Sequence, residues 1–235
     1  LSALRSGAGV AKLAVPKSLS GAVLPYILES TLFPLDDRDG KYVFNEDTAA
    51  KLLLHTRAAA IGMGMGRSDE VAKLIDFALT KYDGRLIIDA DGLNTLAGMD
   101  REKLRGAACR VILTPHPKEF ERISGIKFEE FRCDIPGAAK RFAAENNVIL
   151  LLKGAATVIT DGKSTFIVDR GCTGMSTAGS GDVLSGILAG ICGYVKDEDL
   201  TLSVAAGAYL NGRAGELAQE DIPAVSMLSG DTVAH

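Results

Sequence analysis

The sequence predicts an α/β protein in which helices cover a mainly parallel β-sheet. Short apolar, β-branched segments alternate with helical patterns along most of the 235 residues. One segment, VILLLKG at 148–154, is apolar without interruption, as expected of a central strand that is buried on both faces. Near the end, two short segments flank Asp161-Gly162, a tight-turn signal that predicts a late antiparallel hairpin over 157–169.

The first half of the chain supplies three of the expected strands and two helices. Ser68 suits an N-cap, and the apolar residues after it recur at the spacing of one helical face, so a helix is expected from there to Tyr82. Another helix is expected near 20–29. The expected strands are KLAVP (12–16), RAAAIG (57–62) and RLIIDAD (85–91).

The second half continues the same alternation. A strand is expected at RVILTP (110–115) and a helix at 136–147, ahead of the central strand. Two apolar helices follow the hairpin, at about 181–195 and 199–219. No linker, repeat or low-complexity stretch interrupts this order, which favours a single domain over residues 1–235.

Composition excludes several classes of partner. The apolar content of 47% is enough for one sizeable core. A net charge of -4 argues against a nucleic-acid or anionic membrane surface, so an anionic ligand must be held by local groups. No apolar run has the length and flanks of a membrane span, and no signal peptide is visible. The protein is therefore expected in the cytoplasm, with no membrane partner.

Cysteine and histidine usage indicates neither disulfides nor zinc. The four cysteines lie far apart without a C-x-x-C spacing, and buried free thiols in a reducing compartment are the expectation. The three histidines do not have the spacing of zinc ligands. No metal ligand is assigned. The cysteines are Cys109, Cys133, Cys172 and Cys192.

Polar, Gly-rich or Pro-rich residues stand where each expected parallel strand stops. The strand ends carry AIGMGMG, IDAD, LTPHP and LKGAAT. Ligands of open α/β sheets bind beyond the carboxyl ends of the strands. The sequence therefore predicts a ligand site along this edge.

The stretch GMSTAGSGD precedes an apolar helix and carries the clearest chemical signal. The backbone N–H groups of Gly179, Ser180 and Gly181 would lie at the helix N-terminus, where they and the helix dipole favour an anion. Asp182 at the same place suits a general base that takes a proton from a hydroxyl attacking phosphorus. Simple capping of the helix by Asp182 is the alternative.

The remaining motifs permit two interpretations each. The turn GMGMG has neither a Walker A nor a G-x-G-x-x-G spacing, and it is either a tight structural turn or a ligand contact. His116 lies between two prolines that fix its direction, either at the ligand or in a structural role. Lys153 follows the central strand and suits nucleotide phosphates, unless it is a surface lysine. Asp89, with its neighbours in IDADGLN, would meet magnesium through water, bind a hydroxyl or cap a helix.

Taken together, six motifs in this order resemble one family over nearly the whole chain. They are SALRSGAGVAKLAVP, AIGMGMG, IDADGLN, LTPHPKEF, LLKGAATVITDG and GMSTAGSGDVLSGILAG. They look like the ADP- or ATP-dependent NAD(P)H-hydrate dehydratases, a branch of the ribokinase-like superfamily. The resemblance implies a three-layer α/β/α sandwich. It also implies repair of the S epimer of hydrated NADH or NADPH by phosphorylation of its hydroxyl and elimination of phosphate.

The resemblance also implies roles for individual residues. Asp182 would deprotonate and contact the hydrate, and the Gly179–Gly181 amides would steady the phosphoryl group. Gly64, Gly66 and His116 would contact the hydrated dinucleotide. Magnesium would accompany the nucleotide phosphates, and a homo-oligomer, a tetramer in particular, is expected. The AMP portion of ADP or ATP would be lined by Lys153, Gly154, Ala155, Ala156 and Thr157, with Gly181 nearby.

The sequence departs from the family pattern in three places and at its start. Cys172-Thr173-Gly174-Met175 replaces N-P-G-M, Ala178-Gly179 replaces a Gly-Gly pair, and GMGMG replaces G-P-G-L-G. These changes affect loop detail more than catalysis. The family's first strand is expected to be missing before Leu1. A ribokinase-like kinase for a vitamin-precursor alcohol or sugar is the alternative function, and a non-catalytic nucleotide-binding module is the third.

Overall fold

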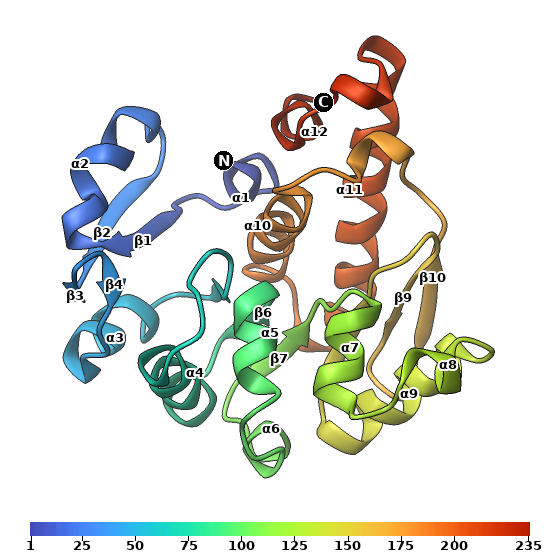
Figure 1. The fold of residues 1–235 in the computed structure, drawn as a ribbon, viewed down its shortest axis with the longest axis horizontal. Coiled ribbons are helices and arrows are strands. Elements are labelled where there is room, and N and C mark those ends of the chain that lie inside the picture. The colour runs from blue at the N-terminus through green and yellow to red at the C-terminus, as the bar shows by residue number, and fades with distance from the viewer.

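A computed structural model describes all residues, Leu1–His235, and contains the expected central sheet. Its six strands lie in the order β10-β9-β8-β7-β6-β5, and Figure 1 labels four of them, β6, β7, β9 and β10. The pairings from β5 to β8 are parallel, whereas β9 pairs antiparallel with both β8 and β10. The strands are β5 (Ala58–Ile61), β6 (Arg85–Ile88), β7 (Arg110–Leu113), β8 (Ile149–Leu152), β9 (Thr157–Thr160) and β10 (Thr165–Val168).

Both faces of this sheet are buried, and alternate residues of each strand enter different cores. In β6, Leu86 and Ile88 pack in the larger core, while Ile87 between them packs in the second. Successive side chains of a strand point to opposite faces, so a strand covered on both sides must be apolar throughout. This explains why the central strands show no polar alternation.

Helices form a layer on each face of the sheet (Figure 1). The second core joins the sheet to α10 (Ser180–Cys192) and α11 (Leu200–Asp221), which also pack on each other. The larger core joins the opposite face to α4 (Asp69–Lys81) and α9 (Ile135–Asn146). The remaining helices of this side are α3 (Glu46–Leu53), α5 (Ala90–Leu96), α6 (Glu102–Arg105), α7 (Pro117–Ser124) and α8 (Phe128–Phe131).

The N-terminal segment forms a small structure beside the central sheet. β1 (Lys12–Pro16) pairs in parallel with β2 (Thr31–Leu35), and a short hairpin joins β3 (Asp37–Arg38) to β4 (Lys41–Tyr42). Leu35 and Tyr42 from this segment are buried in the larger core. No strand pairs with the outer edge of β5. Three short helices complete the fold, namely α1 (Ser2–Arg5), α2 (Ser20–Val23) and α12 (Ser229–Ala234).

Most of the expected elements are confirmed. Ser68 caps α4 by accepting a hydrogen bond from the Val71 N–H, and Gly162 takes a φ of +87° in the expected hairpin turn. The expected helix at 20–29 is wrong, because α2 ends at Val23 and only a 3₁₀ turn follows over Leu24–Tyr26. Pro25 has no N–H for a helical bond, and its ring collides with the carbonyl one turn earlier.

The cysteine expectation needs one correction. All four thiols are free, and Cys109 and Cys192 are buried, but Cys133 is exposed and Cys172 is half-buried. Cys133 lies in the short exposed segment between α8 and α9, where no apolar layer covers it. None of the helices combines the length and the hydropathy that crossing a membrane requires.

Candidate active site

Four connecting turns meet at one edge of the sheet. Because β5, β6, β7 and β8 are parallel, the segments that follow them emerge at the same edge. These segments are 62–66, 89–91, 114–116 and 153–157, the ones that the sequence indicated. The chain therefore brings residues up to about a hundred positions apart into one region.

The first turn of α10 adds a set of backbone donors to this region. Gly179 is the N-cap and has a φ of +87°, a conformation that favours glycine. Of the three expected amides, the Ser180 N–H is already used, since it donates to the Thr177 carbonyl at 3.3 Å. The N–H groups of Gly179, Gly181 and Asp182 have no protein acceptor. Sequence reasoning missed the Asp182 amide, which is one residue farther into the helix.

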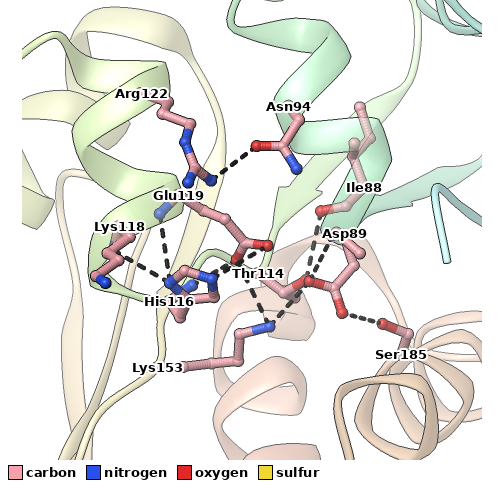
Figure 2. A network of polar contacts seen from close by, with 11 residues as sticks. Ile88, Asp89, Asn94, Thr114, His116, Lys118, Glu119, Arg122, Lys153 and Ser185 are labelled. Atoms are coloured by element: carbon pink, nitrogen blue, oxygen red, sulfur yellow. Dashed lines mark hydrogen bonds and ion pairs between the residues drawn. The ribbon is translucent and has the colours of Figure 1, made fainter. Parts of the chain in front are cut away.

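A buried carboxylate, Asp89, links the end of β6 to two other elements (Figure 2). Only 2% of Asp89 is exposed. Its Oδ1 accepts from the Lys153 ammonium at 2.9 Å and from the Ala90 N–H at 2.9 Å, and its Oδ2 accepts from the Ser185 hydroxyl at 3.1 Å. The Lys153 ammonium also lies 4.0 Å from the Glu119 carboxylate. Lys153 is thus no ordinary surface lysine.

Asp182 lies on the exposed side of this network. It is three residues from Ser185 on α10, a spacing that puts both side chains on one helical face. Partial burial raises the pKa of Asp182, and the negative charge of Asp89 raises it further, while the Lys153 ammonium lowers it. A carboxylate with a raised pKa is a stronger proton acceptor, which suits a general base.

His116 combines a capping role with an exposed ring. Its Nδ1 accepts from the N–H groups of Lys118 and Glu119, and the Glu119 carboxylate accepts from the His116 N–H in return. This capping box begins α7. The imidazole remains 45% exposed, and its Nε2 lies 3.5 Å from Glu119 (Figure 2). Its ring can therefore both hold the helix and face a ligand.

The GMGMG turn is built from three glycines with positive φ. Gly62 has a φ of +122° and packs against the Asp89 and Gly92 backbone, so its role is structural. Gly64 and Gly66 have φ values of +67° and +69°, are exposed, and have no atom near the place of a Cβ. The Gly66 N–H donates to Asp91 at 2.9 Å, which ties the turn to the first turn of α5.

Two sets of predicted residues remain, the segment after β8 that is expected to line the nucleotide and the polar residues of IDADGLN. Gly154, Ala155 and Ala156 are exposed in the segment between β8 and β9, and Thr157 is half-buried at the start of β9. The polar residues of IDADGLN hydrogen-bond within the protein, which favours a structural role over contact with magnesium or a hydroxyl. Asp89 and Asp91 accept from protein groups, and Asn94 accepts from Arg122 at 2.9 Å. No three His, Cys, Asp or Glu side chains are placed to hold a metal ion together.

Sequence reasoning did not find Ser185 or Glu119, and it did not pair Asp89 with Lys153. Ser185 is a polar residue in an otherwise apolar helix, and Glu119 stands three residues after His116, the capping-box spacing. Both signals were present in the sequence. The Asp89–Lys153 pair carries no local signal, since 64 residues separate its members.

Comparisons with known proteins identify the family. A family model described as NAD(P)H-hydrate dehydratase matches residues 1–233. An ADP-dependent (S)-NAD(P)H-hydrate dehydratase of Cenarchaeum symbiosum is 37% identical, over 94% of this chain and 75% of its own. A bifunctional NAD(P)H-hydrate repair enzyme of Moorella thermoacetica is also 37% identical, over 97% of this chain. The chain spans only 43% of that longer relative.

Solved structures share the fold. An ADP/ATP-dependent NAD(P)H-hydrate dehydratase of Bacillus subtilis, crystallised with ATP and Mg²⁺ and soaked with CoA, matches with a TM-score of 0.80 at 28% identity. The match covers 99% of this chain and 81% of the other. A ribokinase-like superfamily protein of Enterococcus faecalis also has a TM-score of 0.80, at 21% identity, over 99% of this chain and 77% of its own. The expected ribokinase-like fold is thus confirmed.

Proposed function

The chain belongs to the NAD(P)H-hydrate dehydratase family, and we propose that it restores NADH or NADPH from the S epimer of its hydrate with ADP or ATP as phosphoryl donor. The reaction makes it a carbon–oxygen lyase. The observation that carries the proposal is the carboxylate of Asp182, whose pKa is raised, beside free amides at the start of α10 and the Lys153 ammonium.

The chemistry follows from these groups. Asp182 takes the proton of the substrate hydroxyl, the hydroxyl oxygen forms a bond to the terminal phosphorus, and the bond from that phosphorus to the rest of the nucleotide breaks. The free amides of Gly179, Gly181 and Asp182 are suited to receive the charge on the transferred oxygens. Elimination of phosphate then breaks the carbon–oxygen bond, a proton leaves the neighbouring ring carbon, and the carbon–carbon double bond that forms restores the reduced dinucleotide.

The remaining site residues are assigned to the two ligands. Gly64, Gly66 and His116 bind the hydrated dinucleotide, because the two glycines leave open space and the histidine ring is half-exposed. Ser180 shapes the loop, since its N–H is held by Thr177. The nucleotide binds along Lys153, Gly154, Ala155, Ala156 and Thr157, with Gly181 nearby.

Magnesium is expected with the nucleotide, as in the crystals of the Bacillus subtilis relative. The side chains of this chain do not by themselves form a magnesium site. Mg²⁺ is commonly held by substrate phosphates and water with few protein ligands, and this arrangement fits an open site without a carboxylate cluster.

The assembly and the location are also proposed. A homo-tetramer is supported by exposed apolar side chains on the outer face of α11, Leu202, Tyr209 and Leu210, which are 54%, 46% and 53% exposed. A single catalytic domain is supported by the continuous sheet and its two helix layers, and the unpaired edge of β5 is where a further strand would pair. A cytoplasmic location fits the four free thiols.

The test is an assay of the purified S hydrate with ADP or ATP in turn, following reduced-nicotinamide absorbance and free phosphate together. We expect both to rise in equal amounts with at least one nucleotide. A ribokinase-like kinase would instead release a stable phosphorylated alcohol and leave the hydrate untouched. If neither nucleotide supports the absorbance change, the proposed function is wrong.

A further inference from the structure

Asp89 has a structural position that none of the roles above explains. It is a nearly inaccessible carboxylate, yet it contacts three separate elements: its own α5, the end of β8 through Lys153, and α10 through Ser185. An ionised group is costly to bury unless charged and polar partners surround it. Asp89 has such partners, and every one of them borders the candidate active site.

The first turn of α10 rests directly on the Asp89–Lys153 pair. A Cβ at Gly181 would lie 3.2 Å from Asp89 Oδ2 and 3.7 Å from Lys153 Nζ. The ion pair is therefore packed against the turn whose free amides face the proposed phosphoryl position. A side chain at residue 181 would therefore crowd the Asp89 carboxylate, while the ammonium would be at ordinary contact distance.

The backbone around Asp89 is held in an unusual conformation. Ala90, directly after it, has a φ of +50°, which is uncommon for a residue other than glycine, asparagine or aspartate. Gly62 packs so closely that a Cβ there would lie 2.0 Å from the Asp89 carbonyl oxygen. Strained backbone of this kind persists where the surroundings fix it, and it is concentrated at functional sites.

We infer that Asp89 is a positioning residue that holds the Lys153 ammonium beneath the first turn of α10 and places a fixed negative charge beside Asp182. This inference rests on the proposed function. A lysine side chain has a flexible four-carbon stem, so an unpaired ammonium would spread over several positions. Glu119, 4.0 Å away, is the nearest other partner and lies on the side of α7.

The charge of Asp89 also acts on the proposed base. It raises the pKa of Asp182, and Lys153 opposes it with a smaller effect. Other ionisable groups on elements that pack against α10 are engaged elsewhere or do not affect this carboxyl. They are Arg5 of α1, Arg85 of β6, which pairs with Asp197, Asp231 of α12, which binds the Leu228 N–H, and five residues of α11. Of these five, Arg213 and Glu216 pair with each other, Asp221 lies beside His235, Tyr209 lies under Arg170, and Glu220 does not act on Asp182.

The test compares Asp89→Asn with Asp76→Asn. The asparagine keeps the size of Asp89 and can still accept from Ala90 and donate to or accept from Ser185, but it loses the charge that holds Lys153. We expect kcat to fall about 10- to 100-fold, while the Kd for ADP weakens by less than about 3-fold. Asp76 on α4 forms an ion pair with Lys103 on α6 at 2.5 Å and bonds to no group of the candidate site, so its variant should keep wild-type kcat.

A double-mutant cycle separates positioning from mere support of the fold. In a Lys153→Met background, Asp89→Asn should lower kcat much less than in the wild type, because the group that it positions is gone and only its charge beside Asp182 is still lost. Equal losses in both backgrounds would overturn the inference, and so would an unchanged kcat in a folded Asp89→Asn protein. Thermal melting identifies variants that have simply lost structure.

Two readouts do not depend on the proposed reaction. Carboxyl ¹³C NMR should show a lower pKa of Asp182 in Asp89→Asn than in the wild type, and a crystal structure of the variant should show Lys153 Nζ displaced. An unchanged pKa together with an undisplaced ammonium would refute the inference. If the wild type ignores the hydrate but these two changes occur, only the proposed function has failed.

Discussion

Gly62 provides the sharpest test of how the turn after β5 supports the site. A methyl group on this residue would lie 2.0 Å from the Asp89 carbonyl oxygen and 2.6 Å from the Gly92 nitrogen. Both atoms belong to backbone, which cannot rotate away as a flexible side chain can. The Gly62→Ala variant must therefore shift the start of α5 or the end of β5.

Gly64→Ala is the matched control two residues along the same turn. Its φ of +67° is also positive, but no atom lies within 4 Å of the added Cβ. At Gly64 the left-handed conformation costs an L-residue about 1–2 kcal/mol, offset by about 0.4–1 kcal/mol from the stiffer unfolded chain. The φ of Gly62, +122°, lies outside the left-handed well, so its substitution carries at least the same backbone cost. Overpacking adds about 1–3 kcal/mol for Gly62→Ala alone. We expect the two variants to differ by about 2 kcal/mol in free energy of unfolding.

The assay is urea unfolding followed by far-UV circular dichroism, with slope and midpoint fitted together. The difference is a sizeable part of the about 5–15 kcal/mol that stabilises a typical domain. Gly62→Ala should also displace Asp89 and lower turnover. Equal unfolding free energies for the two variants would show that the backbone contact is not limiting, and the packing argument would be wrong.

Three further outcomes are expected. Asp182→Ala should lower kcat at least about 10²-fold while ADP still binds in calorimetry, and lost ADP binding would mean that its role is misassigned. Burial raises the pKa of Cys109 to about 11 and that of Cys192 to about 12. The contribution of these protonated thiols to the free energy of unfolding is therefore complete at neutral pH, and it is lost as pH rises above the ordinary thiol range. Unfolding free energy should therefore fall between about pH 9 and 12, and less steeply in a variant with alanine at both positions. Light scattering should give the mass of a tetramer that Leu210→Glu dissociates, and a monomeric wild type would contradict the proposed assembly.

Local signals predicted the elements that depend on neighbouring residues. The Ser68 cap, the Asp161-Gly162 turn and the apolar run of β8 each act over a few positions, and each appears where the sequence indicated. The helix at 20–29 was mispredicted because its apolar content outweighed the breaking effect of Pro25. Strand β1 appears where it was expected, but its partner β2 and the separate hairpin of β3 and β4 were not foreseen, since these short strands carry little periodicity.

The sequence by itself determined the fold class, the family resemblance and the position of Asp182 at the start of a helix, because these depend on short-range patterns. Tertiary structure alone decided that Asp89 meets Lys153 and Ser185, which follow it by 64 and 96 residues in the chain. Parallel pairing brings the ends of β6 and β8 to one edge, and packing of α10 on the sheet adds the third partner. Such meetings depend on which strands pair and which faces pack, and residues near each partner in the chain carry no record of that choice.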